Sequence, residues 1–350
     1  MVNQAYEQVI ERGRKATEEG VKAGEAGLHF KAATLYGTAV EAFMRARNEA
    51  RAYEADGFRH YHLGTDAAHT GPHAKVVQHF DDAEIYFQRA GRRAGPAFWS
   101  YVCGGRAAHV RGLMALHALQ YPEAARYFDR AETAFETAEA LAQAGTPTSA
   151  VVKVNRRHTH ALATYARAEL ALSIGECDKA TSHFRESDNL WSAVVNEPSV
   201  PPIVTRDIQG WMYFVRGSAN YTSALLARAA GNDESALELF SRSQVELAAA
   251  ILEARASPAA TDLRDLVRKR MIWVDYALSC APAELVRGTP NDEPHRATIQ
   301  HSAPSGPPVS AAPLCSPFIA KTPLTQSGSL ATTRPRDRTP TPSTKASPTM

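Results

Sequence analysis

One short motif returns along this chain and constrains its fold more than any other feature. In it, an alanine is followed four residues later by Tyr or Phe, and three residues after that by Ala or Ser. These spacings place the three side chains on one face of an α-helix. The motif occurs at Ala32/Tyr36/Ala39, Ala83/Phe87/Ala90, Ala124/Phe128/Ala131, Ala180/Phe184/Ser187 and Ala236/Phe240/Ser243.

Small residues also precede each leading alanine at two fixed distances. Nine positions before it stand Ala23, Ala74, Ala115, Ala171 and Ala227, and twelve positions before it stand Gly20, Gly71, Gly112, Ala168 and Ala224. Small residues let two antiparallel helices approach closely, while the aromatic ring fills the gap between successive pairs. The pattern therefore predicts a repeated helical hairpin.

Apolar residues recur at helical spacing over most of the chain, and alternating strand patterns are almost absent. Gly, Pro and Asn mark the breaks between the apolar stretches. The predicted fold class is therefore all-α. Eleven helices are expected, over residues 3–24, 29–47, 49–63, 75–91, 97–119, 122–144, 150–174, 178–196, 203–230, 233–256 and 259–280.

The segments GNDESALELFSRS, GECDKATSHFRES and ALQYPEAARYFDRA resemble the tetratricopeptide repeat (TPR) family, whose helix pairs carry the same alanine and aromatic element. The resemblance covers about residues 13–255 and implies a right-handed α-α superhelix, that is, a TPR-like solenoid. Successive leading alanines are 51, 41, 56 and 56 residues apart, so the hairpins are longer than the usual unit. A weaker similarity of residues 35–61 to the helical-hairpin adaptors that assist membrane-fusion ATPases indicates the same long-hairpin architecture.

Two features depart from a regular repeat. In the second unit, Gly71 and Ala74 flank Pro72, which would break a helix, so the first helix of that unit is expected to be 49–63. The last helix, 259–280, is expected to cap the array with its apolar face. Its basic residues are expected on a solvated face: Arg264, Arg268, Lys269 and Arg270.

The composition changes near Ala281. Thirteen of the 21 prolines lie in residues 282–350, which contain neither Trp nor Tyr. Such a segment buries too little apolar surface to offset the entropy of ordering. We therefore predict a helical solenoid over 1–281 and a disordered, Pro/Ser/Thr-rich tail over 282–350.

The charge balance and the cysteine spacing limit the classes of partner and the cellular location that we expect for this chain. Residues 1–281 carry 32 Lys/Arg against 33 Asp/Glu, so we expect no nucleic-acid partner. No apolar stretch is long enough for membrane insertion. The four cysteines show no paired spacing, which is typical of reduced thiols and makes the cytoplasm the expected location: Cys103, Cys177, Cys280 and Cys315.

Histidines crowd into one short stretch beside Asp66, namely His60, His62, His69, His73 and His79. Zinc requires ligands that converge, and the one pair with four-residue spacing, His69 and His73, spans the helix-breaking Gly71-Pro72. The stretch is therefore interpreted as a polar loop, and we expect neither a metal site nor a cofactor.

Asp81, Asp82 and Glu84 resemble the aspartate-rich motif of class I terpene synthases, which are Mg²⁺-dependent helical enzymes. That family's second metal motif would begin at Asn232, but Ala236 and Phe240 replace its Ser and Glu ligands. Negative charge at a helix start explains the aspartates more simply, just as Asn232-Asp233 is expected to cap the start of another helix. A synthase stays a remote alternative, and we expect no enzymatic activity and no catalytic residues.

A binding surface remains. The TPR resemblance implies partner contacts from polar and aromatic residues on the first helices of successive hairpins: Arg106, His109, Asn155, Tyr165, Tyr213, Asn220 and Tyr221. The first hypothesis is a scaffold or adaptor that holds a peptide or helix of another protein in a concave groove. The second is a regulatory sensor that responds to a peptide or small ligand. Homo-oligomers are compatible with both.

Overall fold

The structure is a computed structural model that describes residues 2–91, 94–142, 147–196, 202–256 and 261–280. These residues form helices and turns without any strand, so the all-α prediction is confirmed for them. The predicted tail, 282–350, lies outside the described residues. The helices are α1 (Val2–Glu25), α2 (His29–Arg45), α3 (Glu49–Thr70), α4 (His73–Ala90), α5 (Ala94–His117), α6 (Tyr121–Leu141), α7 (Pro147–Ser173), α8 (Cys177–Val195), α9 (Pro202–Ala229), α10 (Asp233–Ala256) and α11 (Thr261–Ser279).

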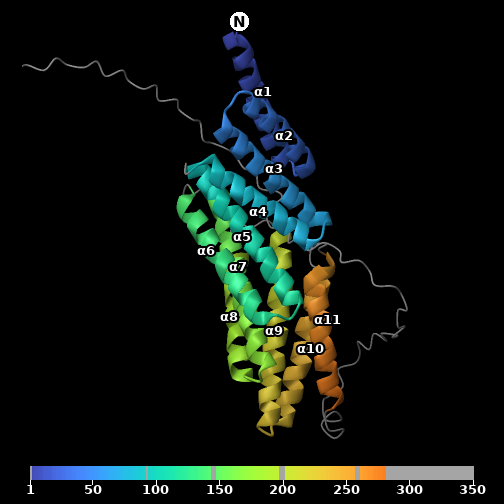
Figure 1. Cartoon of the computed structure of the whole chain (residues 1–350). Helices are drawn as coiled ribbons and strands as arrows, with labels where there is room; N and C mark the ends of the chain where they lie inside the picture. The colour runs from blue at the N-terminus through green and yellow to red at the C-terminus, as the bar shows by residue number, and fades with distance from the viewer. Residues whose placement is uncertain (1, 92–93, 143–146, 197–201, 257–260, 281–350) are drawn as a thin grey trace, which may run out of the picture.

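The helices form an elongated array in which each one packs mainly against the helices before and after it in the sequence (Figure 1). The buried apolar side chains form two clusters along this array. One cluster lies mainly within α1–α6, and the other extends from α5 to α11. The last helix, α11, contacts both α10 and α9, so it folds back beside the array.

The repeated motif supplies the centre of this packing. All five leading alanines are 0% exposed, and the five aromatic rings are at most 1% exposed. An equivalent hydrogen bond occurs in each of two units. Ser187 Oγ donates to the Ala161 carbonyl at 2.8 Å, and Ser243 Oγ donates to the Gly217 carbonyl at 2.7 Å. The donor follows the acceptor by 26 residues in both cases. These two hairpins therefore pack their helices in the same register.

The turns inside four of the hairpins are equivalent too. In each, a backbone N–H donates at 2.9 Å to the carbonyl of an alanine five residues earlier, which closes the helix C-terminus as in a Schellman motif. The donor and acceptor pairs are Leu28 and Ala23, Gln120 and Ala115, Glu176 and Ala171, and Asn232 and Ala227. The residue before each donor has a positive φ: Gly27, Leu119, Gly175 and Gly231. The small residue nine positions before the motif thus marks the last turn of the first helix.

Leu119 is the one non-glycine among these four turn residues, with φ 58°. Its side chain is 55% exposed, so removing it sacrifices little buried surface. We expect Leu119→Gly to raise the free energy of unfolding by about 0.5–1 kcal/mol, because glycine relieves the left-handed strain. Urea unfolding followed by circular dichroism measures the change. Gly175→Ala is the control and should lose stability, whereas a loss for Leu119→Gly as well would contradict this account.

The second hairpin corrects one predicted boundary. Helix α3 does not end at Gly64 but continues to Thr70. A Cβ on Gly64 would lie 3.0 Å from the Phe80 ring, and one on Gly57 would lie 2.8 Å from the Phe87 ring. These glycines allow close helix packing rather than ending the helix. Gly57 therefore takes the role expected of Gly71, opposite the aromatic ring of its unit.

The prediction that the basic residues of the last helix lie in solvent is wrong for one of them. Leu263, Val267 and Val274 are buried as an apolar stripe should be. Arg270, however, is also buried and forms an ion pair with Glu169 of α7. Because α11 folds back beside the array, its arginine lies within the packing rather than in solvent.

Candidate functional site

Arg106 and His109 lie one turn apart on α5, and both contact neighbouring helices. Arg106 Nη1 donates to Thr65 Oγ1 at 3.2 Å, and its guanidinium lies 4.9 Å from the centre of the Tyr61 ring. His109 Nδ1 lies 3.2 Å from Thr159 Oγ1. Burial, helped by the charge of Arg106, lowers the pKa of His109 to about 4, so its ring is neutral at pH 7.

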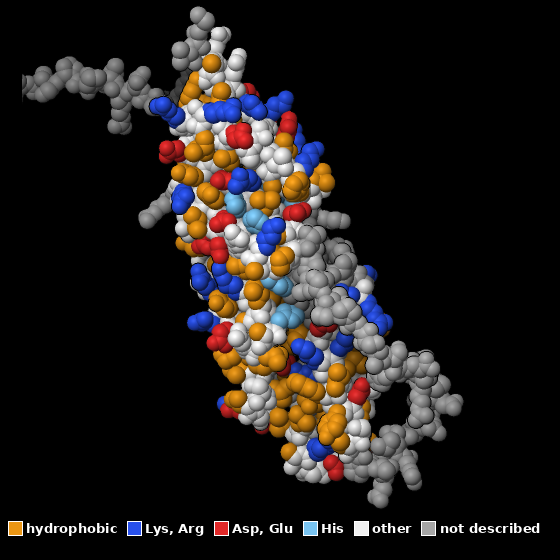
Figure 2. Space-filling model, turned by 45° about the vertical axis from the view of Figure 1, so that its right-hand side comes forward, with side chains coloured by type: hydrophobic (Ala, Val, Ile, Leu, Met, Phe, Trp, Pro, Cys, Tyr) orange, Lys and Arg blue, Asp and Glu red, His pale blue; other side chains and the backbone are white. Residues whose placement is uncertain are grey.

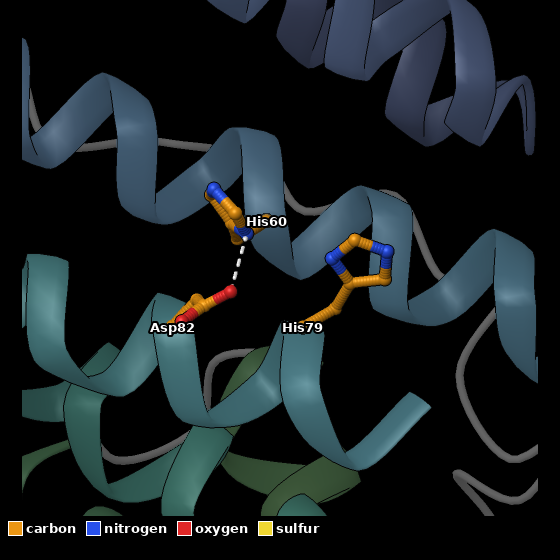
Figure 3. Close-up of side chains that lie close together, drawn as sticks. All are labelled: His60, His79 and Asp82. Atoms are coloured by element: carbon orange, nitrogen blue, oxygen red, sulfur yellow. Dashed lines mark ion pairs between the residues drawn. The ribbon is translucent and has the colours of Figure 1, made fainter. Parts of the chain in front are cut away.

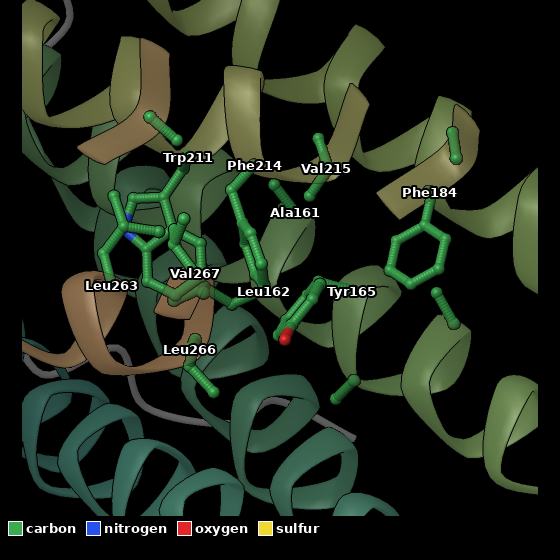
Figure 4. Packing of buried hydrophobic residues seen from close by; sticks show 14 of the residues in the cluster. Ala161, Leu162, Tyr165, Phe184, Trp211, Phe214, Val215, Leu263, Leu266 and Val267 are labelled. Atoms are coloured by element: carbon green, nitrogen blue, oxygen red, sulfur yellow. The ribbon is translucent and has the colours of Figure 1, made fainter. Parts of the chain in front are cut away.

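Asn155 and Tyr165, two further predicted contacts on α7, are buried. The Tyr165 ring packs against Phe184, Trp211 and Phe214 in the core of the C-terminal half (Figure 4). Burial, with the nearby charge of Glu169, raises the pKa of the Tyr165 hydroxyl well above its usual value. Neither side chain is open to a partner in this conformation.

The remaining three predicted residues lie on α9. Tyr213 and Asn220 are half-buried, and Tyr213 packs on the hydrophobic core. Tyr221 lines a pocket whose lining includes none of the other six. Of the seven predicted contacts, Tyr221 is thus the one that lines this pocket.

This pocket, called the α11 pocket below, has a volume of about 630 Å³. It lies where α6 begins and where α7, α9 and α11 end. Its lining is mostly apolar and aromatic, with Glu169 and Arg228 as the charged members. The lining residues are Tyr121, Glu169, Leu172, Ser173, Tyr221, Leu225, Arg228, Ile272, Trp273, Tyr276, Ala277 and Cys280.

Side chains at the mouth of the α11 pocket are exposed although they are large and apolar. Ile272, Trp273 and Tyr276 project from the side of α11 that does not carry its buried stripe. Hydrophobic side chains gather at the lower end of the face shown in Figure 2. An exposed apolar patch that leads into a concave, aromatic-lined pocket is typical of a surface that binds a ligand or a protein.

A buried ion pair fixes one wall of the pocket. Arg270 Nη2 of α11 donates to Glu169 Oε1 of α7, and the two side chains are 3% and 4% exposed. The Arg270 guanidinium also lies 5.5 Å from the Tyr221 ring and 5.0 Å from the Trp273 ring. The aromatic faces stabilise a cation that carries a buried, unbonded Nη1. The pair therefore joins two helices that are far apart in the sequence.

The hydroxyls of Tyr121 and Tyr221 stay protonated at neutral pH. Burial and then the charge of Glu169 raise the pKa of Tyr121 to about 12, and burial raises the pKa of Tyr221. Arg228 Nη2 donates to the carbonyl of Ala277, which holds the end of α11. The pocket thus offers hydrogen-bond donors around an apolar interior.

Sequence reasoning missed Trp273 and Tyr276. Both were assigned to a capping helix whose only expected role was to cover the last repeat. The signal that they give in the sequence is two aromatic residues placed off the apolar stripe of that helix. The position of α11 beside α7 carries no local signal, so the pocket itself was not predictable.

The histidine stretch is helical rather than a loop, which corrects that interpretation. His60 and His62 lie on α3, and His73 and His79 lie on α4. His62 is buried and its Nδ1 lies 3.1 Å from His29 Nδ1. Burial lowers the pKa of His62 to about 3.

The two aspartates of the synthase-like motif also differ from expectation. They lie in the middle of α4, not at its start, and they face different helices. Asp81 forms an ion pair with Arg111 of α5, and Asp82 lies 3.5 Å from His60 Nδ1 of α3. By contrast, the expected cap at Asn232 is confirmed, because the Ser235 N–H donates to Asn232 Oδ1 at 3.1 Å.

Two further findings concern the cysteines and the question of a membrane-spanning helix. Cys103, Cys177 and Cys280 are free thiols, and Cys315 lies outside the described residues. None of the helices in the described part combines the length and apolar composition needed to cross a bilayer.

Comparison of the chain with protein-family models, with curated proteins and with solved structures found no match.

Proposed function

We propose that this protein is an interaction scaffold or adaptor that holds a peptide or helix of a partner protein against the α11 pocket. The observation that carries the proposal is the aromatic-lined cavity of about 630 Å³ with exposed apolar side chains at its mouth. A cavity of this size accommodates one or two large side chains. An amphipathic helix with an aromatic or aliphatic anchor fits such a surface.

The architecture that we propose is a TPR-like, right-handed solenoid of long hairpins. Its support is the equivalent packing in successive units: the buried motif, the shared Ser187 and Ser243 hydrogen bonds, and the four matching turns. In such a solenoid α7 and α9 are first helices of their hairpins and contribute to the concave face. The pocket residues Glu169 and Tyr221 come from these two helices.

The second candidate is a regulatory sensor, and one observation favours it. The pocket is walled on one side by α11, which is joined to α7 through Glu169 and Arg270. A ligand that binds there contacts both sides of this connection and biases the position of α11. Hydrogen exchange separates the two candidates. A scaffold slows exchange only in the helices that line the pocket, whereas a sensor also changes exchange in helices that do not line it, such as α10, which packs against α11.

The scaffold proposal is tested by a substitution that adds a bulky side chain at the rim of the pocket. Ser173 lines the pocket but is exposed, so Ser173→Trp adds bulk there without disturbing the core. Peptides are selected on the full-length protein from a displayed library of amphipathic helices. We expect Ser173→Trp to weaken their binding by at least about tenfold, equivalent to about 1.4 kcal/mol, measured by fluorescence anisotropy.

The matched control is Ser182→Trp, the same change at an exposed serine of α8 that does not line the pocket. It should leave peptide affinity unchanged. A library that yields no binder, or binders that bind Ser173→Trp as tightly as the wild-type protein, would contradict the proposal.

A further inference from the structure

Three metal-ligating side chains converge between α3 and α4, away from the α11 pocket. His60 comes from α3, and His79 and Asp82 lie one turn apart on α4 (Figure 3). One potential ligand atom from each residue lies within 4.8 Å of those of the other two. One ring nitrogen of His79 points toward His60 and Asp82 (Figure 3).

The ring nitrogens at this place lack the hydrogen bonds that buried nitrogens usually have. Nδ1 of His60 and Nδ1 of His79 are both buried without a hydrogen-bond partner. Asp82 Oδ2 lies 3.5 Å from His60 Nδ1, which is too far for a good hydrogen bond. Each of the two imidazoles therefore turns an unsatisfied ring nitrogen to the place where the three side chains converge.

The ligand types and their spacing suit a transition metal. Zinc binds His nitrogen and carboxylate oxygen at about 2.0–2.2 Å, so tetrahedral ligands lie roughly 3.4 Å apart. The ligand atoms, which now lie within 4.8 Å of one another, must come closer by side-chain rotation to bind one ion. His60 is 12% exposed and Asp82 is 36% exposed, which leaves a path for the ion and for water.

We propose that His60, His79 and Asp82 bind a divalent transition-metal ion of the Zn²⁺ type, with water in the remaining coordination position. Two imidazoles and one carboxylate disfavour Mg²⁺ and Ca²⁺, which prefer all-oxygen sites. Because the ligands come from two helices, the ion fastens α3 to α4 within the N-terminal half. The proposal is independent of the function assigned to the α11 pocket.

Arg59 opposes the ion and gives the proposal a second test. Its Nη2 donates to His60 Nε2 at 3.1 Å, so in the metal-free state the proton of the neutral ring resides on Nδ1. Metal binding at Nδ1 moves this proton to Nε2, with no net release, and Arg59 must turn away. Arg59 Nε already lies 3.0 Å from Asp56 Oδ1, which retains the guanidinium after it turns.

The experiment titrates ZnCl₂ into the full-length, metal-stripped protein by isothermal calorimetry. Co²⁺ serves as a spectroscopic probe of the coordination geometry. We expect one site per chain, and His79→Ala or Asp82→Ala should each weaken it at least about 100-fold, since losing an outer-shell partner alone costs about 10–100-fold. Arg59→Gln should tighten it, because the positive charge that opposes the ion is removed.

The matched control is His183→Ala, which removes a histidine of α8 that faces Glu186 at 3.4 Å. It should leave the zinc affinity unchanged. Circular dichroism of every variant verifies the fold, so that lost binding is not lost structure. Absence of a stoichiometric site in the wild-type protein, or zinc binding that survives both ligand substitutions, would overturn the proposal.

Discussion

Replacing Glu169 with alanine is expected to lower the free energy of unfolding by about 3–5 kcal/mol. The substitution leaves the Arg270 guanidinium buried at 3% exposure without its carboxylate. The rings of Tyr221 and Trp273 remain, but cation–π contacts contribute only about 1–2 kcal/mol. Urea unfolding monitored by circular dichroism measures the loss.

Two controls separate burial from charge pairing as the cause. Glu238→Ala breaks an exposed ion pair with Arg242 within α10 and should change stability by at most about 0.5 kcal/mol. The double substitution Glu169→Leu with Arg270→Met removes both buried charges and should recover most of the loss. If Glu169→Ala proved as mild as Glu238→Ala, the ion pair would not hold α11 in place.

The same pair explains why the pocket was beyond sequence reasoning. Glu169 and Arg270 are separated by 101 positions, and neither the spacing nor the local pattern indicates that they meet. A basic residue in an amphipathic helix is solvated in most proteins, so the prediction for Arg270 followed the general rule. Only the fold-back of α11 reverses it, and that depends on long-range packing.

Features that depend on local sequence, by contrast, could be predicted. All eleven helices of the described residues were predicted, because apolar periodicity and Gly/Pro punctuation act within a few residues. The largest boundary error, at Gly64, arose because a glycine gives the same local signal for a helix end and for close packing. Its real reason is the Phe80 ring on the next helix, which is not a neighbour in sequence.

The candidate metal ligands show the same limit. The search for ligands within one helix led to His69 and His73, which a proline separates. The set that converges joins His60 with a pair on the next helix, His79 and Asp82. Their register across the helix pair is decided by packing, so no spacing rule within one segment detects it.

Replacing Phe128 with alanine is expected to cost about 3–5 kcal/mol, the other large effect in this chain. Phe128 is 0% exposed, and a Cβ on Gly112 would lie 2.6 Å from its ring. The ring therefore fills the space that Gly112 leaves open, and its removal creates a cavity between α5 and α6. Phe30→Ala is the control, since that ring is 67% exposed and should cost little.

The proposed solenoid is tested by which helices lose stability after the Phe128→Ala substitution. In a repeat protein each unit contacts only its neighbours, so a defect weakens its own hairpin and the adjacent ones first. Native-state hydrogen exchange should therefore accelerate in α5 and α6 after Phe128→Ala, while amides in α10, packed around Phe240, stay protected. Uniform acceleration in all described helices would instead indicate one cooperative core, and the repeat interpretation would then be wrong. Since the rings of Phe128 and Phe240 occupy equivalent places in the motif, Phe240→Ala should give the reverse pattern in the same protein.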